Sequence, residues 1–111
     1  MQLFFDYFCQ VIFCLMNKVG NTIREKRKAK NLLLRHLAAM LDIDVAIISK
    51  IERGERTASK EHLMKISKVL EIEPDLLLGY QIVENIILEL ENSNNSEEIL
   101  KIVKKELKHI L

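Results

Sequence analysis

The sequence has few of the residues on which several specialised protein classes depend. Its 111 residues include one Pro, three Gly and no Trp, and aromatic residues make up 5%. The scarcity of Pro and Gly excludes collagen-like and low-complexity chains, and so few aromatic rings argue against a platform that stacks nucleic-acid bases. The two Cys cannot form a disulfide scaffold or, without further ligands, a structural zinc site. The three His are scattered. We therefore expect neither a metal nor another cofactor, and no set of side chains predicts an enzyme.

The residues that are abundant indicate a small, all-helical (all-α) protein. Hydrophobic residues make up 49% of the chain and charged residues 30%, so the chain can bury a core. A length of 111 residues allows one domain and little more. Apolar residues recur at intervals of three and four, which is the period of an amphipathic helix, and no stretch alternates with the period of a strand.

Charge is unevenly distributed along the chain, although the net charge is only +1. Residues 18–60 hold eleven Lys/Arg and five Asp/Glu, a balance of +6, whereas residues 61–111 hold six Lys/Arg and ten Asp/Glu, a balance of −4. Asp6 supplies the remaining −1. A basic first half and an acidic second half suggest a polyanion-binding face joined to a partner-binding or solvating half.

The first sixteen residues differ from the rest, because thirteen of them are apolar and they include both Cys. A signal peptide is not expected, since a basic leading region and a small-residue cleavage site are missing. The segment is also shorter than the ~20 residues of a membrane span. A membrane-surface anchor stays open as an alternative, but no basic flank precedes Lys18, and we expect no membrane partner. We favour the interpretation that translation begins at Met16. The alternative is an extra helix that packs on the domain or on a partner, with Cys9 and Cys14 as ordinary buried thiols.

Capping and breaking residues divide the remaining chain into short helices. Those that suit a helix end or an N-cap are Asn31, Asp44, Gly54 and Ser59. Pro74 fits the first turn of a helix that we expect to close at Gly79. Two more apolar stripes follow at residues 82–90 and 99–110, separated by a polar loop at residues 92–96.

Residues 34–53 are the informative stretch, because two short helices separated by about three residues form a helix-turn-helix pattern. Ala38 supplies the small residue that two closely crossing helices need. Asp42 stands where the turn needs a residue tolerant of left-handed backbone. The outward face of the second helix is left free to enter a DNA major groove. The apolar side chains that fix the second helix on the first are Leu37, Leu41, Ile43, Ile48 and Ile51.

Residues 19–79 resemble the helix-turn-helix domain of the Cro/CI (XRE) type, which is found in phage repressors, restriction–modification controllers and many antitoxins. The resemblance rests on the segments IREKRKAKN, LAAMLDI, SKIERGER and ISKVLEI. It implies a five-helix, lambda-repressor-like DNA-binding domain and sequence-specific binding of double-stranded DNA. It also implies a structural ion pair between Arg27 and Glu52.

Within this pattern, the second helix holds the candidates for base contacts, and three arginines are candidates for phosphate contacts. Small apolar side chains can contact a thymine methyl group, and a lysine can donate to O6 and N7 of guanine. Where the family usually has Ser-Gln this chain has Leu33-Leu34, and the polar opening of the second helix is absent, so readout of adenine by Asn or Gln is not expected. The base-contact candidates are Val45, Ala46, Ile47, Ser49 and Lys50, with Lys50 the candidate for guanine. The phosphate candidates are Arg35, Arg53 and Arg56.

We therefore expect three segments: an apolar extension at residues 1–15, the DNA-binding domain at 16–80, and a C-terminal helical extension, a hairpin, at 81–111. The hairpin is expected to serve oligomerisation or to bind a protein partner, since its acidic character keeps it away from DNA. The predicted function is a cytoplasmic transcriptional regulator, a repressor or autoregulator that binds a palindromic operator as a homodimer. Two alternatives stay open: an antitoxin-like protein whose C-terminal helices grip a toxin, and a helical adaptor that does not bind DNA.

Overall fold

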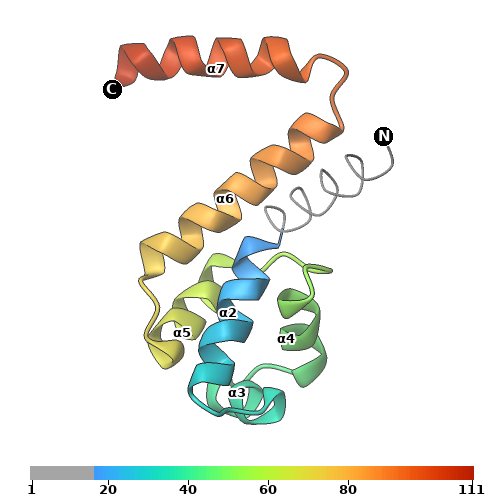
Figure 1. Ribbon diagram of the computed structural model, residues 1–111, viewed down its shortest axis with the longest axis vertical. Coiled ribbons are helices and arrows are strands. Elements are labelled where there is room, and N and C mark those ends of the chain that lie inside the picture. The colour runs from blue at the N-terminus through green and yellow to red at the C-terminus, as the bar shows by residue number, and fades with distance from the viewer. Residues whose placement is uncertain (1–16) are drawn as a thin grey trace.

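The computed structural model describes residues 17–111, and every regular element in that range is a helix (Figure 1). The predictions made for residues 1–15, including those for Cys9 and Cys14, lie outside the described residues. The helices are α2 (Lys18–Ala29), α3 (Leu34–Leu41), α4 (Val45–Glu52), α5 (Lys60–Leu70), α6 (Pro74–Glu91) and α7 (Ser96–Ile110). The all-helical fold class predicted from the sequence is confirmed across this range.

Several helix boundaries follow directly from local side-chain chemistry. The Asp44 carboxylate accepts a hydrogen bond from the backbone N–H of Ala46 at 2.8 Å, and the Ser59 hydroxyl accepts one from His62 N–H at 3.1 Å. These are the two N-caps predicted for α4 and α5. Asp42 has a left-handed backbone with φ of 55°, which stops α3 and turns the chain toward α4.

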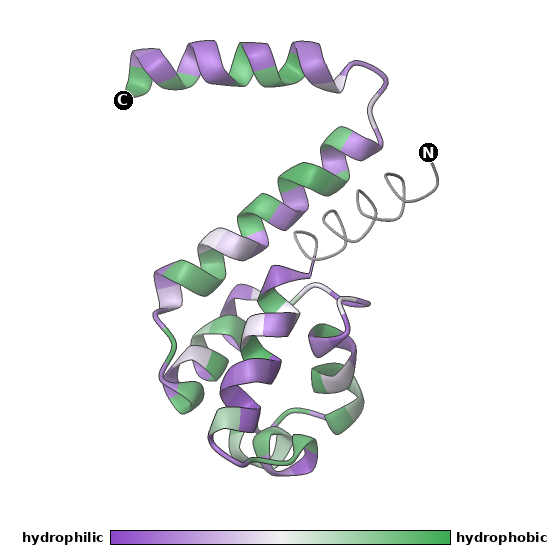
Figure 2. Cartoon of the chain, in the orientation of Figure 1, coloured by the Kyte–Doolittle hydropathy of each residue, from purple (hydrophilic) through white to green (hydrophobic). Residues whose placement is uncertain are grey.

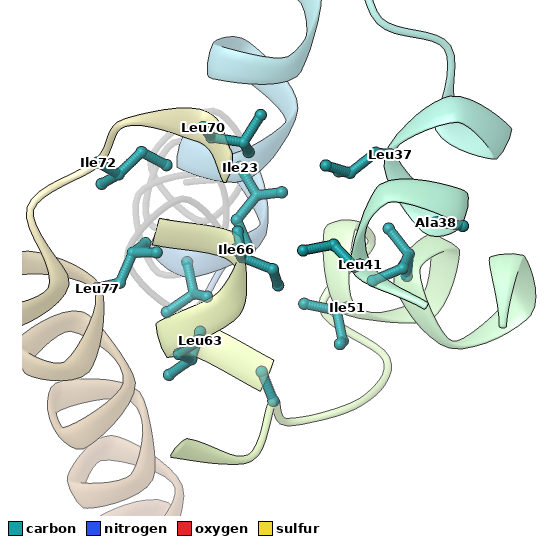
Figure 3. Close-up of a cluster of buried hydrophobic side chains, with 13 residues drawn as sticks. Ile23, Leu37, Ala38, Leu41, Ile51, Leu63, Ile66, Leu70, Ile72 and Leu77 are labelled. Carbon is teal, nitrogen blue, oxygen red and sulfur yellow. The ribbon is translucent and has the colours of Figure 1, made fainter. Parts of the chain in front are cut away.

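The core lies between α2, α3, α4, α5 and the first turn of α6 (Figure 3). Ile66 of α5 stands near its centre with no exposed surface. Burying a side chain of this size contributes about 1.5–3 kcal/mol, so this cluster is the main source of the domain's stability. The most deeply buried large side chains are Ile23, Leu37, Ile48, Leu63, Ile66, Leu70 and Leu77.

Helix α6 differs from the prediction, because it continues through Gly79 to Glu91 instead of closing there. A glycine inside a helix costs about 1 kcal/mol relative to alanine. Here the cost is offset by anchors on both sides, since Leu77 before it and Gln81 and Glu84 after it are buried against the domain. The boundary expected between residues 80 and 81 therefore falls inside a continuous helix.

Helix α7 leaves the rest of the molecule after the polar turn that follows α6. Figure 1 shows that the chain turns back after α6 and that α7 diverges from α6 at an open angle. No residue of α7 is buried. The helical period of the sequence identifies α7 itself, but it does not set the angle at which a helix leaves a polar turn.

Candidate nucleic-acid interface

The helix-turn-helix consists of α3 and α4, and α4 is fixed to the domain by one face only. Ile48 has no exposed surface and Ile51 is 2% exposed, because both side chains enter the core shared with α2 and α3. Figure 1 shows that α6 and α7 lie away from α4. The opposite face of α4 is therefore open to solvent, as a helix that enters a major groove must be.

An ion pair fixes the C-terminal end of α4. Arg27 of α2 and Glu52, the pair implied by the family resemblance, are in bidentate contact: Nε donates to Oε2 at 2.8 Å and Nη2 donates to Oε1 at 3.1 Å. The two side chains are only 11% and 5% exposed, so the pair is largely shielded from water. The third guanidinium nitrogen, Nη1, donates to the carbonyl oxygen of Leu32 at 2.9 Å.

The first turn of α2 lies against the same end of α4, a contact that the sequence analysis did not identify. Asn17 is buried, and its side-chain amide donates to the backbone carbonyl of Glu52 at 3.3 Å. A Cβ at Gly20 would collide with the carbonyl oxygens of Ile51 and Glu52. The signal available in the sequence was this glycine inside a helix, which is the position where another backbone approaches closely.

The outer face of α4 presents part of the predicted base-contact set. Val45 is 42% exposed, and Ala46 and Lys50 are also exposed. Ser49 is half-buried. Ile47 is also half-buried and packs against the core cluster, so only part of its side chain is available to a groove.

Three arginines on or next to the helix-turn-helix are exposed. Arg35 on α3 and Arg56 after α4 are exposed, and neither forms an ion pair within residues 17–111. Arg53 is also exposed, but its guanidinium contacts the Glu55 carboxylate at 3.3 Å and donates to the carbonyl oxygen of Ser49. Exposed pairs of this kind are worth about 0–1 kcal/mol, so Arg53 can exchange this partner for a phosphate at little cost.

The first turn of α3 also offers backbone N–H groups to an anion. Helix α3 begins after Leu33, whose side chain has no oxygen with which to cap the free N–H groups of the first turn. Uncapped N–H groups at a helix N-terminus attract anions. In α4 the Asp44 carboxylate already satisfies the Ala46 N–H, so the start of α3 is the better backbone donor of the two.

Neither a metal site nor a membrane-crossing helix is found in the described part of the chain. Within residues 17–111, no three His, Cys, Asp or Glu side chains are arranged to hold a metal ion. None of the helices in this range has both the length and the apolar character needed to cross a bilayer.

Comparisons with known proteins give a consistent result. Residues 23–77 match the helix-turn-helix family. Control protein C.BamHI of Bacillus amyloliquefaciens is 37% identical over 67 residues, which are 60% of this chain and 83% of that protein. The restriction-modification controller protein C.AhdI from Aeromonas hydrophila has 35% sequence identity and a TM-score of 0.52, with 56% of this chain and 94% of that chain covered.

A more distant structure shares the fold. The clp gene regulator ClgR from Corynebacterium glutamicum aligns with a TM-score of 0.54 over 87% of this chain and 89% of that chain, at 22% identity. At such low identity the match concerns the fold alone.

The identity to the two control proteins, together with the braced α3–α4 unit, leads to a specific assignment. The chain belongs to the Cro/CI (XRE) family of helix-turn-helix transcriptional regulators.

Proposed function

We propose that this protein is a control protein of a restriction–modification system, which binds a palindromic operator as a homodimer and represses or autoregulates transcription. The observation that carries the proposal is that one face of α4 is held in the core while the other is exposed. Its inner face is buried and braced at the C-terminal end by Arg27 and Glu52, while its outer face is open. The names of the two control-protein relatives supply the biological setting.

We assign base contacts and phosphate contacts to side chains according to their exposure and their chemistry. Val45 and Ala46 provide apolar contact to thymine methyl groups, and Lys50 donates to guanine O6 and N7. Ser49 offers a hydroxyl from a half-buried position, and Ile47 contributes the exposed part of its side chain. Phosphate contacts come from the backbone at the start of α3 and from the arginines Arg35, Arg53 and Arg56.

In this proposal a two-fold symmetric dimer regulates transcription by occupying DNA that polymerase needs. One domain reads one half-site, and two domains related by a two-fold axis read half-sites one helical turn, about 34 Å, apart. A dimer bound over a promoter blocks polymerase, or positions it at a neighbouring promoter. The extension formed by residues 81–111 holds the two copies together and stays away from the acidic duplex.

Selection of bound fragments from random duplex DNA with the full chain tests this function. We expect an enriched sequence with two-fold symmetry, and we expect it upstream of the protein's own gene and of a neighbouring endonuclease or methyltransferase gene. Binding to the selected site should exceed binding to a shuffled site of equal composition by at least 10³-fold, the lower end for specific regulators. If no sequence is enriched, the regulator function is wrong and the adaptor interpretation replaces it.

A further inference from the structure

Helix α6 has an apolar seam on the side that faces away from its own domain. The seam residues recur at alternating intervals of three and four, which is the heptad spacing of helices that pack along one another. Leu76, Val83 and Ile86 are 44%, 49% and 49% exposed. Since Leu77, Gln81 and Glu84 hold the opposite side of α6 on the domain, this seam has no partner within residues 17–111. We call Leu76, Gly79, Val83, Ile86 and Leu90 the α6 seam.

Gly79 gives the α6 seam room for a close neighbour. A Cβ built at this position meets nothing within 4 Å, so no contact inside the described chain requires a glycine there. Its backbone is also far from the left-handed region that favours glycine, because it lies inside a regular helix. A glycine at a packing surface lets a second helix approach the backbone closely.

Helix α7 carries a matching stripe that is also unpartnered. Its apolar residues recur at intervals of three, four and three, and together they line one face of the helix (Figure 2). Helices of this length are marginal in water without packing partners, so an α7 with no buried residue needs another surface. We call Leu100, Val103, Leu107 and Ile110 the α7 stripe, and each of them is at least 43% exposed.

The two surfaces are complementary in charge, and the shorter one fits along the longer one. At 1.5 Å per residue the α6 seam is about 21 Å long and the α7 stripe about 15 Å long. Helix α6 carries four acidic and no basic residues, with Glu89 and Glu91 on the two sides of its seam. Along one edge of the α7 stripe lie Lys101, Lys104 and Lys108. Acidic edges on one helix and a basic edge on the other favour pairing of α6 with α7.

We propose that α7 of one protomer packs on the α6 seam of a second copy, and that the partner returns the same contact, so that the dimer is held by exchanged C-terminal helices. Each copy has both surfaces, so a two-fold axis satisfies all four of them at once. The exposed seam and stripe residues offer an apolar area on the order of the ~800 Å² per partner of a stable interface. The proposal rests on the homodimer of the proposed function and names the surface that makes it.

The exchange of α7 between protomers is tested by mixing two variants, each of which has one of the two interface surfaces disrupted. Ile86→Asp places a charge in the α6 seam, and Val103→Asp places one in the α7 stripe. Each variant alone is expected to sediment as a monomer at a concentration where the unmodified chain is dimeric. In an equimolar mixture, the intact α7 of the first variant meets the intact α6 of the second, so a heterodimer with one sound contact is expected. Pairing of α6 with α6, or folding of α7 onto its own α6, gives no such rescue and overturns the proposal.

A matched control variant distinguishes disruption of the α7 stripe from disruption of the α7 helix itself. Ile102 is 56% exposed and lies next to Val103 in the chain but on the other side of α7, outside the α7 stripe. We expect Ile102→Asp to remain dimeric with unchanged helix content by circular dichroism. Monomeric behaviour of both variants would remove the α7 stripe as the interface.

Non-specific DNA binding by the monomeric Val103→Asp variant is expected to persist. This measurement distinguishes loss of the dimer from loss of the DNA-binding function.

Discussion

Arg27 and Glu52 join the beginning and the end of the DNA-binding unit, because the Arg27 guanidinium holds both carboxylate oxygens of Glu52 and also the carbonyl oxygen of Leu32. One side chain therefore connects α2, the turn before α3, and the last residue of α4. Together with the contacts of Asn17 and Gly20, the pair holds this end of α4 against α2 while the outer face stays exposed.

Glu52→Ala is expected to lower the free energy of unfolding by about 3–5 kcal/mol, because it leaves the Arg27 guanidinium buried without its counter-ion. Urea denaturation followed by circular dichroism measures the change. Glu55→Ala is the control, since it removes the exposed partner of Arg53 and should cost about 1 kcal/mol or less. Equal losses in the two variants would show that the Arg27–Glu52 pair does not hold α4 in place.

Gly20→Ala and Gly79→Ala should have opposite effects on stability, although both positions lie inside helices. At Gly20 the added methyl group collides with backbone carbonyls of α4, so α2 and α4 must separate and stability must fall. At Gly79 the methyl group meets open space, and the gain in helix propensity is about 0.5–1 kcal/mol. The comparison is made by thermal unfolding in the Val103→Asp background, where association does not contribute. A stable Gly20→Ala variant would contradict the close approach of α2 to α4.

Local signals in the sequence were sufficient for the helix-turn-helix itself. Asp44 and Ser59 are N-caps by their own side-chain chemistry, and Asp42 tolerates the left-handed backbone that the turn requires. Ile48 faces the core because helical spacing places it on the same face as Ile51. These features depend on residues a few positions apart, which is the range over which a sequence can be interpreted without a fold.

The features that the sequence did not predict depend on distant contacts. Gly79 looked like a helix end, but Gln81 and Glu84 bind the domain beyond it and keep α6 helical. Ile47 and Ile48 are adjacent in the chain, and the packing of α4 on the core decides that Ile48 is fully covered and Ile47 only partly. Glu71 ends α5 with a φ of 57°, a conformation for which its residue type gives no signal.

Lys50→Ala is expected to reduce discrimination between operator and shuffled DNA by about 1–3 kcal/mol, the value of one bidentate contact to guanine, while leaving non-specific affinity nearly unchanged. Fluorescence anisotropy at fixed salt with both duplexes measures the two affinities. Because Lys50 is exposed, the variant should fold as the unmodified chain does, and circular dichroism checks this. An equal decrease on both duplexes would assign Lys50 to the phosphate backbone instead.

Arg35→Ala and Arg56→Ala should each weaken binding to every duplex and reduce the slope of log affinity against log salt by about 0.9, which is one released counter-ion. The measurement is a salt titration of binding to operator and shuffled DNA. Lys65→Ala provides a control, since Lys65 lies on α5 and pairs with Glu61. An unchanged slope in either arginine variant would remove that arginine from the phosphate contacts.

Glu84 is buried between α6 and α2, and this burial is expected to make the domain less stable as pH rises. Its carboxylate Oε1 accepts the Val19 N–H at 2.9 Å, so α6 caps the N-terminus of α2. Burial raises the pKa of this carboxyl above its ordinary value of 4.5, and the backbone N–H groups of Val19 and Lys18 only partly oppose the rise. The folded state therefore binds the proton more tightly than the unfolded state does, and Glu84 lowers stability as pH rises from 4.5 through the raised pKa.

Glu84→Gln tests this sign, because glutamine keeps an oxygen that can accept the Val19 N–H and never ionises. The difference in unfolding free energy between the variant and the unmodified chain should favour glutamine at neutral pH. It should shrink toward a constant value as pH falls below 4.5, where Glu84 is protonated in both states. Urea denaturation at a series of pH values gives the difference directly. A difference that grows in favour of glutamate as pH rises would mean that attraction between the carboxylate and the positive N-terminus of α2 outweighs the cost of burial.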